Sequence, residues 1–122
     1  MTDESTSKER SVPILWRQTF REIVAAFVAA DYRLASGVPG AEPVSAETAT
    51  QIQSYLRDYG ATLVALPEET WESSVCIWTG THWDTLIDLW TQEEGPSDLV
   101  LHARVTDTHP GFSVKVHLVY VP

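Results

Sequence analysis

The chain has 122 residues, a net charge of −9 and a single cysteine. This length fits one domain with a hydrophobic core of its own. The negative field excludes the usual binding of nucleic acid and of anionic membrane surfaces, because both carry phosphates that such a field repels. The lone Cys76 rules out an intrachain disulfide and suits a reducing compartment.

No charged-then-apolar leader opens the sequence, and the longest apolar run, 24–30, is too short to span a bilayer. We therefore expect a cytoplasmic protein with no membrane partner. The charge is unevenly placed: residues 41–98 hold eleven acids against one base, Arg57, while the rest of the chain carries about +1. Two interpretations remain open, a surface that only confers solubility or one that attracts a basic macromolecule.

The N-terminal half predicts a tail and two helices. Residues 1–10 are polar and lack periodicity, so we expect a disordered tail before a single domain at 11–122. Ser11 and Pro13 suggest a helix start, and apolar spacing predicts a helix over 13–34. Its aromatic stripe of Trp16, Phe20 and Phe27 fits a core face better than a docking face. After a Gly/Pro-rich break, Ser45 and Gly60 bound a second helix over 45–59.

The C-terminal half predicts a β-meander with strands at 84–91, 99–107 and 112–121, joined by turns rich in Gly, Pro and acidic residues. A fourth strand is expected at about 73–79, while 62–66 is left open between a brief strand and other packing. The fold class is therefore α+β, with two N-terminal helices packed on one face of a mostly antiparallel three- to four-stranded sheet.

Alternation along these strands separates a buried face from a polar one. The buried set is expected to be Thr85, Ile87, Leu89, Leu99, Leu101, Ala103, Val105, Phe112, Val114, Val116, Leu118 and Tyr120. If Thr106 pairs with Ser113, Arg104 faces Lys115 and His102 faces His117 on the polar face. Asp88 on the next strand completes a possible metal-ligand set, but nearby Arg104 and Lys115 oppose a cation, so we expect no metal and no cofactor.

No catalytic motif is present in the sequence. Cys76 lies in an apolar run without a basic neighbour, and no GxSxG elbow, HExxH pair or Gly-rich phosphate loop occurs. We therefore expect a protein that is not an enzyme.

Tryptophan is abundant, and four of the five lie between 71 and 90 among acidic residues. We expect Trp78 and Trp83 to pack into the core. For Trp71 and Trp90, burial and exposure are equally compatible with the sequence. Exposed aromatics ringed by carboxylates suit a basic protein partner. The predicted partner-binding residues are Glu68, Glu69, Trp71, Glu72, Asp88, Trp90, Glu93 and Glu94.

Several runs of the last two thirds of the chain, LPEETWE at 66–72, THWDTLIDLWT at 81–91, EEGPSDLVLHARV at 93–105 and the closing VHLVYVP, resemble a small uncharacterised bacterial domain. That resemblance carries no assigned chemistry. In size, acidity and lack of a catalytic motif, the chain is also similar in type to immunity proteins that neutralise bacterial toxins.

We therefore expect a non-catalytic protein-binding domain, an immunity- or antitoxin-like inhibitor that occludes a basic toxin or enzyme and is a monomer or a homodimer. The alternative is a small-molecule-binding or enzymatic domain with a pocket lined by Trp16, Tyr55, Trp78 and Tyr120.

Overall fold

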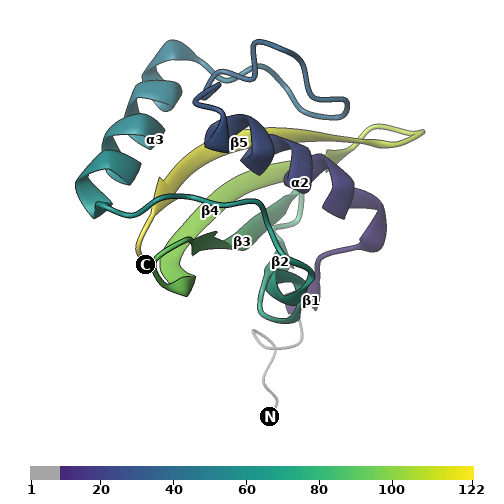
Figure 1. Cartoon of the computed structure of the whole chain (residues 1–122). Coiled ribbons are helices and arrows are strands. Elements are labelled where there is room, and N and C mark those ends of the chain that lie inside the picture. The colour runs from purple at the N-terminus through teal and green to yellow at the C-terminus, as the bar shows by residue number, and fades with distance from the viewer. Residues whose placement is uncertain (1–8) are drawn as a thin grey trace.

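The computed structural model describes residues 9–122, and it contains two helices on one face of a five-stranded antiparallel sheet (Figure 1). The strands lie in chain order across the sheet. The predicted α+β class is confirmed, with one strand more than predicted. The elements are β1 (Glu9–Ser11), α2 (Ile14–Val28), α3 (Ala46–Tyr59), the 3-10 helix η1 (Glu68–Glu72), β2 (Val75–Trp78), β3 (Trp83–Thr91), β4 (Gly95–Asp107) and β5 (Phe112–Tyr120).

The strand that the sequence did not predict is β1, which pairs with β2. Glu9 and Arg10 lie opposite Ile77 and Cys76, so the last two residues of the predicted tail are ordered. Residues 1–8 of that tail lie outside the described residues. Ser11 belongs to β1 and does not cap the helix, which begins after Pro13. Three residues are too few for an alternation signal, which explains the omission.

The first helix, α2, ends at Val28, six residues before the predicted end. Ala30 has a left-handed φ of 66°, its N–H donates to the carbonyl of Phe27, and the N–H of Asp31 donates to the carbonyl of Ala26. This pair of bonds is a Schellman motif, which closes a helix and is usually marked by glycine at the left-handed position. Alanine there gives no such signal in the sequence.

The second helix, α3, matches its prediction closely. Ser45 Oγ accepts from the N–H of Thr48 at 3.2 Å, and Gly60 ends the helix with a φ of 85°. The side chain of Gln51 also bonds the outer edge of β5: its Nε2 donates to the carbonyl of Val119 at 2.7 Å and its Oε1 accepts from the N–H of Val119 at 3.3 Å. These two bonds fix α3 beside the last strand.

The predicted pairing of β4 with β5 is correct at its turn end, where Thr106 faces Ser113 and Arg104 faces Lys115. Between Ala103 and His102 the pairing register shifts by one residue of β5. His102 therefore lies opposite Leu118 and not opposite His117. The extra residue is a β-bulge, which reverses the later alternation of β5. Val119 is therefore fully buried under the helices, while Leu118 and Tyr120 lie on the other face, opposite to the prediction.

The core lies between the helices and one face of the sheet (Figure 1). The aromatic stripe of α2 is buried there, as predicted, and Ile52 of α3 joins it. Most of the predicted buried face of the meander is confirmed. The fully buried core side chains include Phe20, Ile23, Val24, Ile52, Ile87, Leu89, Leu101, Ala103, Val105 and Val114.

The 62–66 segment runs along the free edge of β3 without forming a strand. The N–H of Val64 donates to the carbonyl of Trp90, and the N–H of Gln92 donates to the carbonyl of Thr62. η1 follows on the same edge, where Thr70 Oγ1 donates to the carbonyl of Asp88 at 2.6 Å. The edge of β3 that β2 leaves uncovered is thus protected by backbone and hydroxyl groups.

Candidate partner-binding surface

The sheet face turned away from α2 and α3, here called the open face, is covered by neither helix (Figure 1). Its side chains form rows across three strands, because residues paired in register share a face. The rows are Asp84–Arg104–Lys115, then Leu86–His102–Leu118, then Asp88–Val100–Tyr120, with Trp90 opposite Pro96 beyond them. Charge dominates the first row, and apolar groups dominate the later rows.

A carboxylate at the charged end lies beside two imidazoles. Asp84 Oδ1 lies 3.3 Å from Nε2 of His82 and 3.4 Å from Nε2 of His102. The His102 ring is stacked on the His117 ring, with centroids 5.3 Å apart and an interplanar angle of 23°. The predicted proximity of His102 and His117 is therefore correct, but the carboxylate beside them is Asp84, whereas the prediction named Asp88.

The bulge in β5 places His117 at the junction between the open face and the outer edge of that strand. Burial is the largest of the causes that lower the pKa of the His117 imidazole. The neighbouring Arg104, His102 and Lys115 lower it further. Within residues 9–122, no group of three His, Cys, Asp or Glu side chains is arranged to hold a metal ion.

Trp90 and Asp88 lie together at the other end of the open face, and both are partly exposed. The indole of Trp90 packs over Gly95, the first residue of β4. Asp88 accepts a hydrogen bond from Ser73 Oγ, beside η1. These two predicted partner-binding residues are therefore neighbours of each other and of the acidic η1 segment.

Trp71 of η1 is only 5 % exposed, so its indole is not available as a surface anchor. The guanidinium carbons of Arg17 and Arg21 lie 5.4 and 5.6 Å from the centre of its ring, within cation–π range. Arg21 also pairs with Glu68 at 3.1 Å. Trp71 and Glu68 therefore connect η1 to α2 and are removed from the predicted docking residues.

Glu69 and Glu72 are the predicted acids that remain free. Both are exposed, and neither makes a hydrogen bond or ion pair with any described residue. They belong to η1, whose Thr70 hydroxyl donates to the carbonyl of Asp88, so η1 lies along the edge of β3.

Glu93 and Glu94 have structural roles, which the sequence did not reveal. Glu93 accepts from the N–H of Thr62 at 2.8 Å and from its hydroxyl at 3.0 Å, and the backbone bond lowers the pKa of this carboxyl. Glu94 accepts from the hydroxyls of Tyr59 and Thr91. Glu93 ties the β3–β4 turn to the segment that follows α3, and Glu94 ties it to the last residue of α3.

Cys76 is fully buried, and burial raises the pKa of its thiol to about 11. Its Sγ lies 3.6 Å from the carbonyl oxygen of Ser11 and donates to it. A protonated, inaccessible thiol is a poor nucleophile, which agrees with its interpretation as a core residue.

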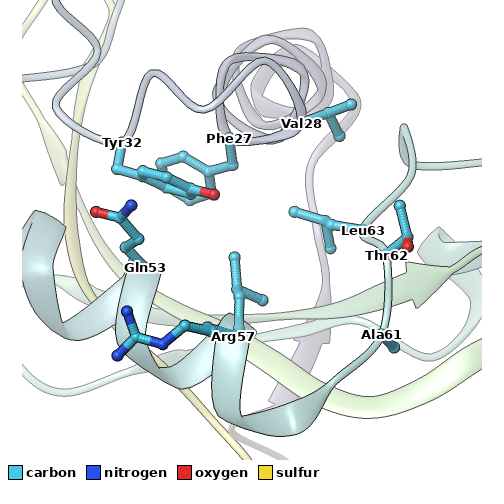
Figure 2. A pocket seen from close by; sticks show the side chains of 9 residues that line it. Phe27, Val28, Tyr32, Gln53, Arg57, Ala61, Thr62 and Leu63 are labelled. Carbon is cyan, nitrogen blue, oxygen red and sulfur yellow. The ribbon is translucent and has the colours of Figure 1, made fainter.

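A hollow of about 390 Å³ lies between the C-terminal end of α2, α3 and residues 61–63 (Figure 2). Phe27, Leu56 and Leu63 give it apolar walls, while Gln53 and Arg57 stand at its rim. It is not the predicted pocket. Trp16 packs against Trp83 on the helix-covered side at 6.1 Å, whereas Tyr120 lies on the open face, so the sheet separates them.

Two tryptophans at the far end of β2 and β3 differ in part from the prediction. Trp83 is partly buried against Trp16, but Trp78 is 42 % exposed and rests on Trp83 with ring centres 5.2 Å apart. Trp78 was expected in the core. It is the last residue of β2, at the turn into β3, where the helices do not cover it.

A family profile described as "Domain of unknown function (DUF7668)" matches residues 24–122. The chain belongs to this family. No curated protein and no solved structure matches the chain. The matched segment begins inside α2 and includes α3, η1 and strands β2 to β5, and so it contains the whole open face.

All the runs that resembled an uncharacterised domain lie within the part that this family covers. They form η1, β3, β4 and the end of β5, which together build the open face and its acidic border. The uncharacterised status of that resemblance is confirmed. The likeness to immunity proteins stays a prediction.

No described helix is long and apolar enough to cross a membrane. Sequence reasoning missed His82, and it did not identify Asp84 as the carboxylate beside the two imidazoles. Asp84 could have been found from register alone, because it lies directly opposite Arg104. His82 precedes β3 and shows no periodic signal.

Proposed function

We propose that this protein is a non-catalytic binding domain, an immunity- or antitoxin-like inhibitor that occludes a basic protein partner. The docking surface would be the apolar end of the open face together with the free carboxylates of η1. In this proposal Trp90 is the anchor, and Asp88, Glu69 and Glu72 supply the complementary charge.

The observation that supports this most directly is the uncovered sheet face. Leu86, Trp90, Leu118 and Tyr120 all lie on it, and all are only partly buried. Interfaces commonly place aromatic and aliphatic side chains at the centre and charges at the rim. An inhibitor of this kind needs only a preformed surface, and antiparallel strands joined by short turns provide a rigid one.

Charge supports the choice of a basic partner. Glu69 and Glu72 are exposed and form no ion pair with any described residue, so they contribute a negative field at the surface. The net charge of −9 adds to that field over the whole molecule. Long-range attraction of this sort raises the association rate with a cationic protein and weakens as salt is added.

The proposal is tested with the product of the adjacent gene, which we expect to be basic and to form the complex. The dissociation constant is measured by calorimetry at about 50 and 500 mM NaCl, a range over which the screening length falls severalfold. Glu69→Lys is compared with Asp58→Lys, which makes the same charge change on α3, on the covered side.

We expect the complex to weaken with salt and Glu69→Lys to weaken it by about tenfold or more. Asp58→Lys should change affinity much less. Absence of a complex, or equal losses in the two variants, would contradict the proposed surface.

A further inference from the structure

The outer edge of β5 is covered at two places and open between them. Near its start, the N–H of Val114 donates to the carbonyl of Gly40, and the carbonyl of Val114 accepts from the N–H of Glu42. Near its end, Gln51 bonds both backbone groups of Val119. Val116 lies two residues after Val114, so its backbone polar groups point to the same edge, where no described residue bonds them.

A hollow of about 520 Å³ lies at this opening, between β5 and the loop that leads into α3. Three nitrogen-bearing side chains line it, those of Arg33, Lys115 and His117. No ion pair joins Arg33 or Lys115 to a carboxylate among residues 9–122, although acids outnumber bases in the chain. Arg33 donates only to a backbone carbonyl, that of Val44, at 3.4 Å.

Basic side chains outnumber carboxylates at this place, because Arg33 and Lys115 line the hollow together with a single acid, Glu42. Lys115 lies directly opposite Arg104, and like charges so paired across strands are unfavourable. Nε of Arg104 is buried and has no hydrogen-bond partner in the structure. The one acid of the lining, Glu42, accepts a hydrogen bond from Ser113 Oγ at 3.2 Å. A bound anion would relieve the repulsion between these cations.

We propose that this hollow binds a small oxyanion, the carboxylate or phosphate group of a small molecule. Lys115 and Arg33 would supply the charge, and His117 and the N–H of Val116 would donate hydrogen bonds. Charge-assisted bonds of this type are the stronger ones in proteins. This site is separate from the proposed docking surface, so it can be tested without a protein partner.

The imidazole of His117 reports on the site. The charged groups around it are Arg104 and His102 on β4, Lys115 on its own strand, Asp84 on β3, and Arg33 and Glu42 in the hollow. An anion beside the ring favours the imidazolium, so binding must raise its pKa. The histidine resonances are followed by NMR over pH in sodium phosphate, sodium acetate or sodium chloride at equal ionic strength.

We expect the titration of His117 to move to higher pH in phosphate or acetate than in chloride, and the anion that moves it identifies the ligand group. Lys115→Gln and Arg33→Gln should weaken the apparent affinity for that anion by about tenfold. Arg57→Gln, a distant exposed arginine, is the control and should bind as the wild type does.

The side chain of Lys115 is exposed and forms no ion pair with any described residue, so we expect its replacement to leave the fold intact. Identical His117 titrations in all three salts would overturn the proposal. So would equal losses in Arg57→Gln and Lys115→Gln, because the effect would then be one of net charge only.

Discussion

The hydroxyl of Tyr59 donates to both carboxylate oxygens of Glu94, at 2.8 and 3.0 Å. The same hydroxyl lies 3.4 Å from the N–H of Asp98 and accepts from it. The last residue of α3 is thereby joined to the turn between β3 and β4. An acid that the sequence assigned to a partner instead holds the helix against the sheet, and its bond raises the pKa of Tyr59.

This contact predicts that Tyr59→Phe and Glu94→Gln each lower the denaturant midpoint of unfolding. The double variant should lose less than the sum of the two, because both changes remove the same bond. Unfolding followed by circular dichroism measures the three variants. Glu72→Gln, which removes a carboxylate without a partner, should unfold as the wild type does, and strict additivity of the first pair would contradict the account.

Glu93 predicts a pH dependence of stability. Its pKa is lowered from the ordinary value of 4.5, chiefly by the bond from the N–H of Thr62. A carboxyl with a lowered folded-state pKa adds stability above its unfolded value, and that stability is lost as pH falls through the folded value. Glu93→Gln should therefore be less stable than the wild type at neutral pH, and the gap should close as pH falls below 4.5. A gap of constant size in urea titrations over this range would be the contrary result.

Alanine at position 30 is predicted to make the protein less stable than glycine would. A left-handed φ of 66° is costly for alanine and free for glycine, which in turn loses more backbone entropy on folding. Ala30→Gly should therefore stabilise the protein by about 0.5–1 kcal/mol. Ala29→Gly is the matched control, because the φ of Ala29 is −86° and glycine gains nothing there. Thermal unfolding that ranks Ala29→Gly as the more stable would contradict the end assigned to α2.

Truncating a side chain should lower stability much more on the covered face of β3 and β4 than on the open face. Leu101 is fully buried under the helices, so Leu101→Ala should cost about 2–5 kcal/mol. Leu86 lies partly exposed on the open face, so Leu86→Ala should cost only about 1 kcal/mol. Urea unfolding of both variants gives the comparison. Equal costs would mean that the open face is covered.

Much of this fold could be predicted from the pattern of side chains alone. The alternation in β3 and β4 determines which residues enter the core, and Ser45 and Gly60 mark α3 at both ends. The end of α2 was hidden because an alanine occupies a position that glycine usually marks. The bulge in β5 was hidden because Leu118, Val119 and Tyr120 are all apolar, so either alternation looks acceptable until the helices are in place.

The binding surface was less predictable, because charge does not reveal whether a carboxylate already has a partner. In the sequence, the acidic pair Glu93 and Glu94 is indistinguishable from the acids Glu69 and Glu72. Only Glu69 and Glu72 lack a bonding partner among the described residues. Contacts between residues that are 31 or 35 positions apart decide the difference. Trp71 is likewise hidden by two arginines of α2 that lie far from it in the chain.

The most direct test of the proposed docking surface is the affinity of Trp90→Ala for the protein encoded by the adjacent gene. Trp78→Ala is the control, because this tryptophan is 42 % exposed at the other end of the sheet. Both variants are first checked for wild-type thermal unfolding. We predict that Trp90→Ala weakens binding by about tenfold or more while Trp78→Ala leaves it unchanged. Unchanged affinity in Trp90→Ala, or a comparable loss in Trp78→Ala, would contradict the assignment of the open face as the binding site.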